Sequence, residues 1–96
     1  MYGTIARLHI RPGMHEAFMA WASTTTTMRM IPGHMESLVY QMDADPSLLT
    51  LVVIFKDRDS YQANASSPEQ HAEYLTMMEF LTEEPEWNDG DIIWRG

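Results

Sequence analysis

The chain has 96 residues, of which 45% are hydrophobic, and a formal net charge of −8. This length holds one hydrophobic core, so we expect a single domain over residues 1–96. The chain contains no cysteine, which excludes disulfides, cysteine-ligated zinc and a thiol nucleophile and is typical of a protein of the reducing cytoplasm. We find no signal-peptide pattern at the N-terminus, and the central apolar run is too short to span a bilayer.

The negative charge is concentrated in the second half of the chain. Residues 57–91 hold ten acidic side chains and only one basic side chain, Arg58, whereas residues 1–56 hold four of each kind. Nucleic acids and anionic membranes are bound through basic patches, so this distribution disfavours both classes of partner. We interpret the acidic half as a solvated face that aids solubility, with a surface for a basic partner as the alternative.

The first third of the chain changes from a strand pattern to a helix pattern. Residues 2–11 alternate, and one side of this predicted strand carries Tyr2, Thr4, Ala6, Leu8 and Ile10. After a turn signal at Pro12-Gly13, apolar residues recur at helical spacing. They form one stripe that contains Met14, Ala17, Phe18, Trp21, Ala22, Thr25 and Met28. The segment Ile31-Pro32-Gly33-His34 ends this predicted helix.

The middle of the chain predicts a β-hairpin. A strand over residues 35–43 is followed by a turn at residues 43–47 and by a second strand, Leu48–Phe55. The second strand has no polar face, because both of its alternating sets of side chains are almost entirely apolar. It therefore needs cover on both sides.

Two helix starts and a last strand follow. Asp57 is placed as the N-cap of a short helix that ends near Ala65. The segment Ser67-Pro68-Glu69-Gln70 has a capping serine, a proline at the first helical position and a glutamine at the third, which predicts a second helix. We expect this helix to end near residues 83–85, residues 87–90 to form a loop, and residues 91–95 to form the fourth strand. One face of the helix would carry His71, Tyr74, Leu75, Met78, Leu81 and Thr82.

The order β-α-β-β-α-β predicts an α+β fold of the ferredoxin-like, split-βαβ type. In this fold two helices cover one face of an antiparallel four-stranded sheet. The other face would keep half of the apolar residues of Leu48–Phe55, and the chain has no further element to cover them. We therefore predict a symmetric homodimer through the sheet face, in which the two sheets pack face to face or close as a barrel.

Several segments together carry a family resemblance. They are the first strand ending in Arg11-Pro12-Gly13, the helix with Phe18 and Trp21, the Gly33-His34 turn, and the two segments Val52–Tyr61 and Ala63–Gln70. On these residues the chain resembles the antibiotic biosynthesis monooxygenase-like family over nearly its whole length. The resemblance implies a dimeric α+β barrel. It also implies a family that includes cofactor-independent oxygenases of anthrones or quinols, haem-degrading enzymes and members with no established activity.

The resemblance places a pocket between sheet and helices, and cofactor-free oxygenation there needs a base and hydrogen-bond donors for an oxyanion. We assign the catalytic roles to His71 as the base, with Tyr74 and Asn64 as donors. Substrate-binding residues would be Tyr61, Trp21, Phe18 and Met78. The alternative for each is an ordinary core or rim residue, because aromatic residues at helical spacing usually pack the core.

The haem-degrading branch of the family does not match. Its asparagine, tryptophan and histidine positions fall at Ala6, Asn64 and Tyr74, so this chain departs from the pattern at all three. The four histidines lie on four separate predicted elements without a metal-ligand spacing, and we expect no metal site and no cofactor.

Two functions from different classes remain. The first is a monooxygenase that acts without metal or flavin on a small aromatic substrate such as an anthrone, a quinol or a polyphenol. The second is a non-enzymatic dimeric module that binds a small molecule or serves in assembly. The nine methionines of the chain suit an adaptable pocket and a loosely specified core equally well.

Overall fold

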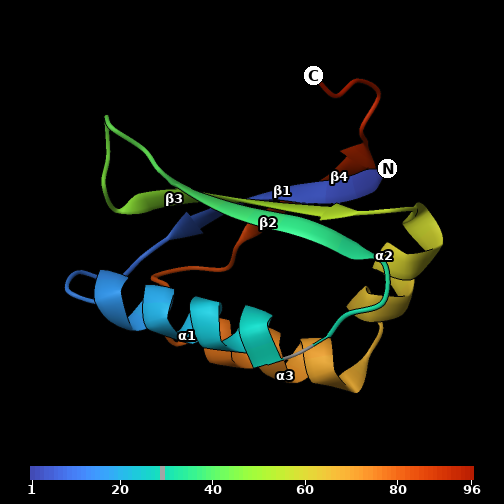
Figure 1. The fold of residues 1–96 in the computed structure, drawn as a ribbon. Helices are drawn as coiled ribbons and strands as arrows, with labels where there is room; N and C mark the ends of the chain where they lie inside the picture. Colours follow the sequence, from blue (N-terminus) through green and yellow to red (C-terminus); the bar gives the residue numbers. More distant parts are fainter. Residues whose placement is uncertain (29) are drawn as a thin grey trace.

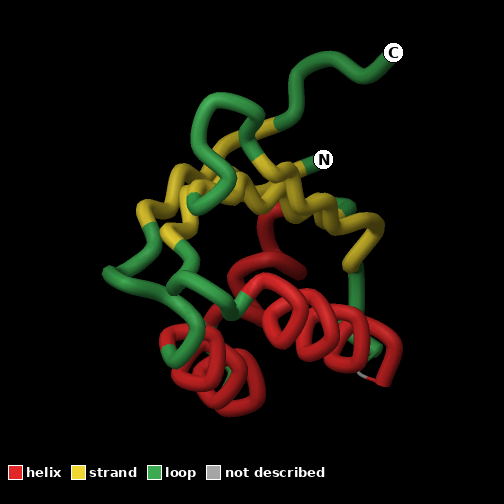
Figure 2. The backbone as a smooth tube through the Cα atoms, turned by 90° about the vertical axis from the view of Figure 1, so that its left-hand side faces the viewer, coloured by secondary structure: helices red, strands yellow, loops and turns green. Residues whose placement is uncertain are grey.

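A computed structural model describes residues 1–28 and 30–96, with no side chains described for residues 25–29. The elements are β1 (Tyr2–His9), α1 (His15–Met28), β2 (His34–Gln41), β3 (Leu48–Phe55), α2 (Arg58–Ala65), α3 (Pro68–Met78) and β4 (Glu86–Asp91). The sheet order is β2-β3-β1-β4, with every neighbouring pair antiparallel. The helices lie on one side of the sheet (Figures 1 and 2). The predicted ferredoxin-like architecture is confirmed.

The core lies where the inner face of the sheet meets α1 and the end of α3. The alternation along β1 is confirmed, because Ala6, Leu8 and Ile10 are at most 1% exposed whereas Ile5 is 51% exposed. These side chains pack in one cluster with Phe18, Leu49, Met77 and Leu81. Full burial of a side chain such as Leu8 contributes roughly 1.5–3 kcal/mol to folding. The stripe members Thr25 and Met28 lie outside the described side chains.

The two predicted N-caps in the second half are confirmed. Asp57 accepts a hydrogen bond from the backbone N–H of Ser60 at 2.8 Å, which starts α2. Ser67 accepts one from the backbone N–H of Gln70 at 3.1 Å, with Pro68 at the first helical position of α3. Each cap satisfies a helix N–H that would otherwise have no intrahelical partner.

The end of the chain differs from the prediction. The fourth strand is Glu86–Asp91, so the predicted loop at residues 87–90 lies inside it, and most of the predicted strand at residues 91–95 lies beyond it. Pairing with β1 explains the difference, because an edge strand is held by backbone hydrogen bonds and tolerates polar side chains. The register aligns Trp87 with Ala6 and Asp89 with Thr4.

Helix α3 also ends earlier than predicted, at Met78 rather than near residues 83–85. After it the chain turns back toward the sheet. Leu81 forms an isolated bridge to Ile10, and the Thr82 N–H donates to the His9 carbonyl at 2.8 Å. Burial of Leu81 against the sheet, at 1% exposure, outweighs one further helical turn.

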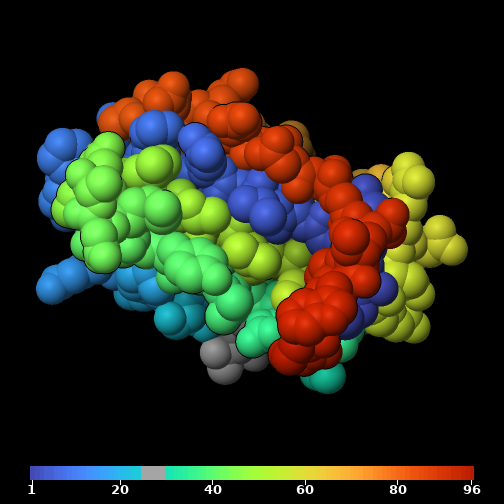
Figure 3. Space-filling view, turned by 90° about the horizontal axis from the view of Figure 1, so that it is seen from above, coloured from blue at the N-terminus to red at the C-terminus, as the bar shows by residue number. Residues whose placement is uncertain are grey.

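The outer face of the sheet has an apolar middle part, and none of the three helices of the described chain covers this face. It carries Ile5, Leu38 and Tyr40, which are 51%, 42% and 54% exposed, and the half-buried Val52 and Ile54. Figure 3 looks onto this face, with the strands open to view and residues 92–96 (red) lying over one end. No helix in the described residues is long and apolar enough to cross a membrane.

Gly3 lies near the start of the interior strand β1, paired with Ile54 on one side and with Gly90 on the other. A Cβ atom on Gly3 would overlap the backbone carbonyl oxygen of Val53, whereas a Cβ atom on Gly90 meets nothing within 4 Å. We expect Gly3→Ala to lower the free energy of unfolding by about 1–3 kcal/mol, because backbone must shift to admit the methyl group. Urea denaturation measures this loss.

Gly90→Ala is the matched control, since it adds the same methyl group to the partner residue in open space. It should be neutral or stabilising by up to about 1 kcal/mol, because alanine restricts the unfolded chain more than glycine does. Equal effects of the two substitutions would contradict the close packing of β1 against β3.

Candidate functional site

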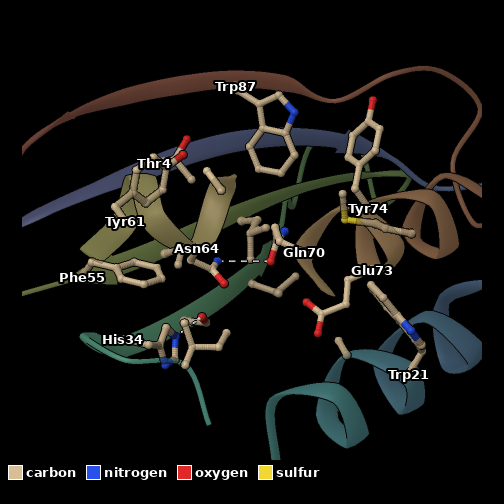
Figure 4. Close-up of a pocket in the computed structure, with 18 of the residues that line it drawn as sticks. Thr4, Trp21, His34, Phe55, Tyr61, Asn64, Gln70, Glu73, Tyr74 and Trp87 are labelled. Atoms are coloured by element: carbon tan, nitrogen blue, oxygen red, sulfur yellow. Dashed lines mark hydrogen bonds between the residues drawn. The ribbon is translucent and has the colours of Figure 1, made fainter. Parts of the chain in front are cut away.

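A cavity of about 810 Å³ lies between the inner face of the sheet and the three helices (Figure 4). This volume is in the range of pockets that hold small organic ligands. All four strands and all three helices contribute to its lining. Most of the lining is apolar or aromatic, which suits a flat, largely apolar ligand.

Aromatic rings surround the two ends of the cavity. At one end Trp21 of α1 contacts Phe80 with ring centroids 5.7 Å apart, and Tyr74 of α3 contacts Trp87 of β4 at 6.4 Å. At the other end the rings of Phe55 and Tyr61 are 5.5 Å apart in an edge-to-face arrangement. Figure 4 shows Tyr61 with Phe55 and Trp87 with Tyr74 on opposite sides of the space. Such pairs stabilise the walls and offer ring faces and edges to a ligand.

Hydrogen-bonding side chains are interspersed with the apolar ones, and three contacts fix several of them in place. The Tyr61 hydroxyl donates to Asp89 Oδ1 at 2.7 Å, and Asn64 Nδ2 donates to Gln70 Oε1 at 3.2 Å. The second contact fixes the side-chain amide of Asn64 in the middle of the cavity wall (Figure 4). A third contact joins His34 Nε2 to the hydroxyl of Ser37 at 2.7 Å, as two neighbouring inward positions of β2.

Tyr61 is held in its neutral form. Burial and the hydrogen bond to the Asp89 carboxylate raise the pKa of Tyr61 to about 12. The nearby Thr4 hydroxyl opposes this increase in the pKa, although in the described structure it is not close and aligned enough for a hydrogen bond. The phenol therefore keeps its proton throughout the physiological range and acts as a donor.

Six of the seven predicted site residues line the cavity, namely Phe18, Trp21, Tyr61, Asn64, His71 and Tyr74. The seventh, Met78, is not in the lining and packs against the core cluster instead. His71 is exposed, and so is Leu75, because the inward face of α3 keeps Tyr74 of the predicted stripe but is centred toward Gln70 and Met77. His71 thus lies at the edge of the cavity and not in its interior.

Sequence reasoning missed several lining residues. Trp87 and Asp89 were missed because residues 87–90 were predicted to form a loop. Their spacing of two residues is nevertheless the signal of one face of a strand. Gln70 was interpreted only as a capping residue, and it lies on the same wall as Asn64. Thr4 was placed correctly on the inward side of the first strand, but a threonine there gave no sign of a cavity behind it.

The chemistry available in the cavity is hydrogen bonding and proton transfer. The donors include the Asn64 amide and the Tyr61 and Tyr74 hydroxyls, the acceptors include the Glu73 and Asp89 carboxylates, and the His71 imidazole lies at the edge. Within residues 1–28 and 30–96 no three histidine or acidic side chains come together as a metal site.

Replacing Tyr61 tests the hydrogen bond to Asp89. A raised pKa in the folded state means that the neutral phenol stabilises the fold below about pH 10, and that this stability is lost as the pH rises toward about 12. We expect the free energy of unfolding to fall more steeply with pH over this window in the wild type than in Tyr61→Phe. Urea denaturation at a series of alkaline pH values measures the slope. Tyr40→Phe, at an exposed tyrosine of the outer sheet face, controls for the loss of a phenol. Identical slopes for wild type and Tyr61→Phe would contradict the hydrogen bond between Tyr61 and Asp89.

Solved structures share this architecture. The cofactor-independent oxygenase SnoaB from Streptomyces nogalater, as an asparagine-to-alanine mutant, is 13% identical with a TM-score of 0.81 over 98% of this chain and 94% of its own. A conserved protein from Methanosarcina mazei Go1 is 23% identical with a TM-score of 0.78 over 93% and 89%. Rv0793 from Mycobacterium tuberculosis is 20% identical with a TM-score of 0.77 over 98% and 96%. These likenesses establish the fold.

Sequence comparison identifies the family. No curated protein sequence matches the chain. The family model described as antibiotic biosynthesis monooxygenase, however, matches residues 1–73, which is well over half of the chain. Together with the fold, this match shows that the chain belongs to the antibiotic biosynthesis monooxygenase family.

Proposed function

We propose that the protein is a cofactor-independent monooxygenase that oxidises a small aromatic substrate, of the anthrone, quinol or polyphenol kind, in the cavity between sheet and helices. The observation that carries the proposal is the cavity itself, about 810 Å³ in volume, lined by aromatic side chains and by hydrogen-bonding groups that include Asn64 and Tyr74. Family membership supports the reaction class, and SnoaB, a cofactor-independent oxygenase, has the same fold.

The proposed reaction makes limited demands on the protein. For an anthrone, the ring CH2 loses a proton to a base, and the carbanion passes electrons to O2 and forms a carbon–oxygen bond. The O–O bond then breaks, one oxygen atom stays as a carbonyl and the other leaves as water. The four electrons lost by carbon are gained by O2. The protein must position the ring, accept the proton and stabilise the negative charge on the ring oxygen.

Three residues are assigned to these tasks. The amide of Asn64, oriented by Gln70, and the hydroxyl of Tyr74 would donate hydrogen bonds to the developing oxyanion. The imidazole of His71 would take the proton, and its exposed position at the edge of the cavity lets it release that proton to water. Trp21 and Phe18 would bind the ring from the α1 side.

A homodimer through the outer sheet face is part of the proposal. The apolar side chains of Ile5, Leu38 and Tyr40 form a broad exposed face on which a second copy of the chain is the natural cover, because the same surface on both copies is self-complementary. Residues 92–96 lie over one end of this face (Figure 3), and Trp94 among them is 80% exposed and adds apolar surface beside Ile5 and Ile54.

The second candidate is a non-enzymatic dimeric module that binds a small aromatic molecule. The exposure of His71 favours it, because a base at the rim of a cavity is less protected from water than catalysis by carbanion formation requires. Oxygen consumption separates the two candidates.

Oxygen uptake with a panel of anthrones and hydroquinones tests the enzyme. We expect turnover by the wild type, a loss of about a hundredfold or more in His71→Ala, and a loss of about tenfold in Tyr74→Phe. His9→Ala is the control, since His9 lies on β1 beside Glu83 and outside the cavity. Uptake that none of the substitutions changes would refute the assigned residues, and no uptake across the panel would favour the binding module.

Light scattering tests the dimer. Ile5→Glu places a charge at the centre of the outer sheet face, and we expect it to weaken dimerisation by roughly a hundredfold or more, because an unpaired charge is costly to bury. Leu75→Glu is the matched control, with 54% exposure against 51% for Ile5 but on the outer side of α3. A wild-type protein that is monomeric at micromolar concentration would contradict the proposal.

A further inference from the structure

One end of the cavity carries a cluster of three oxygen-bearing side chains. Thr4 of β1 and Asp89 of β4 are aligned across the two strands and both point to the helix side of the sheet. Tyr61 of α2 reaches over them and donates its hydroxyl proton to Asp89 at 2.7 Å. Figure 4 shows Thr4 and Tyr61 together at this end, with Phe55 beside them and the Tyr74–Trp87 pair farther along the cavity.

The cluster is incomplete in its hydrogen bonds. Thr4 is 4% exposed, and its hydroxyl, although near enough to the Tyr61 hydroxyl to oppose the rise in the pKa of Tyr61, makes no hydrogen bond in the described part of the chain. The Tyr61 proton is committed to Asp89, and a carboxylate has lone pairs for several donors but no donor of its own. A buried hydroxyl without a partner destabilises a fold, and a valine at Thr4 would fill the same space without that cost.

We propose that Thr4, Tyr61 and Asp89 form a subsite for a hydroxyl group on a neutral aromatic ligand. The ligand O–H donates to the Asp89 carboxylate, which faces the cavity, and the Tyr61 hydroxyl turns to pair with the Thr4 hydroxyl beside it. Ligand binding thereby satisfies the oxygen that is unpaired without it. This inference depends on the proposed function in one respect, namely that an aromatic ring binds in the apolar cavity.

The subsite defines a ligand class. A phenol supplies the hydrogen-bond donor that Asp89 requires. Its methyl ether has no donor, so it displaces water from the carboxylate without replacing the lost hydrogen bond. An aromatic carboxylate meets like charge at Asp89. The preference is therefore for a hydroxylated ring over the methylated ring, and for both over the carboxylated ring.

Binding of 1-hydroxypyrene, 1-methoxypyrene and pyrene-1-carboxylate tests the preference. The three share one ring system, and quenching of the tryptophan fluorescence of Trp21 and Trp87, which line the cavity, reports occupancy. Titrations under nitrogen near pH 6 keep the phenol neutral and separate binding from oxidation. We expect 1-hydroxypyrene to bind the wild type about 10-fold tighter than 1-methoxypyrene, as one hydrogen bond to a carboxylate implies.

Substitutions then locate the preference. Asp89→Ala should abolish it, in part by strengthening the binding of 1-methoxypyrene, which then no longer desolvates a carboxylate. Thr4→Val should reduce the preference to about threefold or less, with the affinity for 1-methoxypyrene unchanged. Thr4→Val should also raise the Tm of the unliganded protein by about 2–6 °C, because it removes an unpaired buried hydroxyl. If Thr4 only filled space, the Thr4→Val substitution would not both raise the Tm and weaken the binding of 1-hydroxypyrene alone. Thr50→Val, at the outer-face threonine of β3 that contacts Met42, is the control.

The outcomes distinguish the subsite from the cavity. Equal affinities of the wild type for 1-hydroxypyrene and 1-methoxypyrene, or an undiminished preference in Thr4→Val, would overturn the subsite while leaving the proposed function intact. Failure of all three pyrenes to bind would overturn both, since no aromatic ring would then enter the cavity.

Discussion

The structure depends on a mismatch between one strand and the elements available to cover it. Strand β3 is apolar on both faces, and it lies between β2 and β1 in the interior of the sheet. All three helices lie on the same side, so one face of β3 is covered by the chain and the other is not. A strand of this kind favours association on its uncovered face, because exposed apolar surface is costly in water.

The covered side is not filled evenly. At one end of α1 and α3 the rings of Phe18, Trp21 and Phe80 pack together, and Leu81 returns the chain to the sheet. At the opposite end α2 places Tyr61 against Tyr2 and Phe55. The cavity lies between these two aromatic groups, and Phe18, Trp21, Phe55 and Tyr61 from them contribute to its lining. The same aromatic residues thus stabilise the fold and define the site.

Most of the fold follows from local signals in the sequence. The alternation along Tyr2–Ile10, the helical stripe with Phe18 and the two caps at Asp57 and Ser67 all correspond to observed structure. The fourth strand was misplaced because its residues, Glu86–Asp91, are polar and contain a glycine, so that only pairing with β1 makes them a strand. Intrinsic propensity says little about an edge strand of this kind.

The site was predictable in part for the same reason. The residues on α1, α2 and α3 were found from helical spacing and from the resemblance, but His71 lies at the exposed edge of the cavity, since the helix buries Met77 rather than Leu75. Predicting Asp89 as a site residue required the register of β4, and predicting Thr4 required the knowledge that a cavity lies beside it.

A crystal structure with a hydroxylated polycyclic aromatic bound tests the proposed site most directly. The account predicts the ring between sheet and helices, its oxygen about 3 Å from the Asp89 carboxylate, and a second copy of the chain against the outer sheet face. A cavity closed by Trp21 and Tyr74, with the ligand elsewhere, would contradict it.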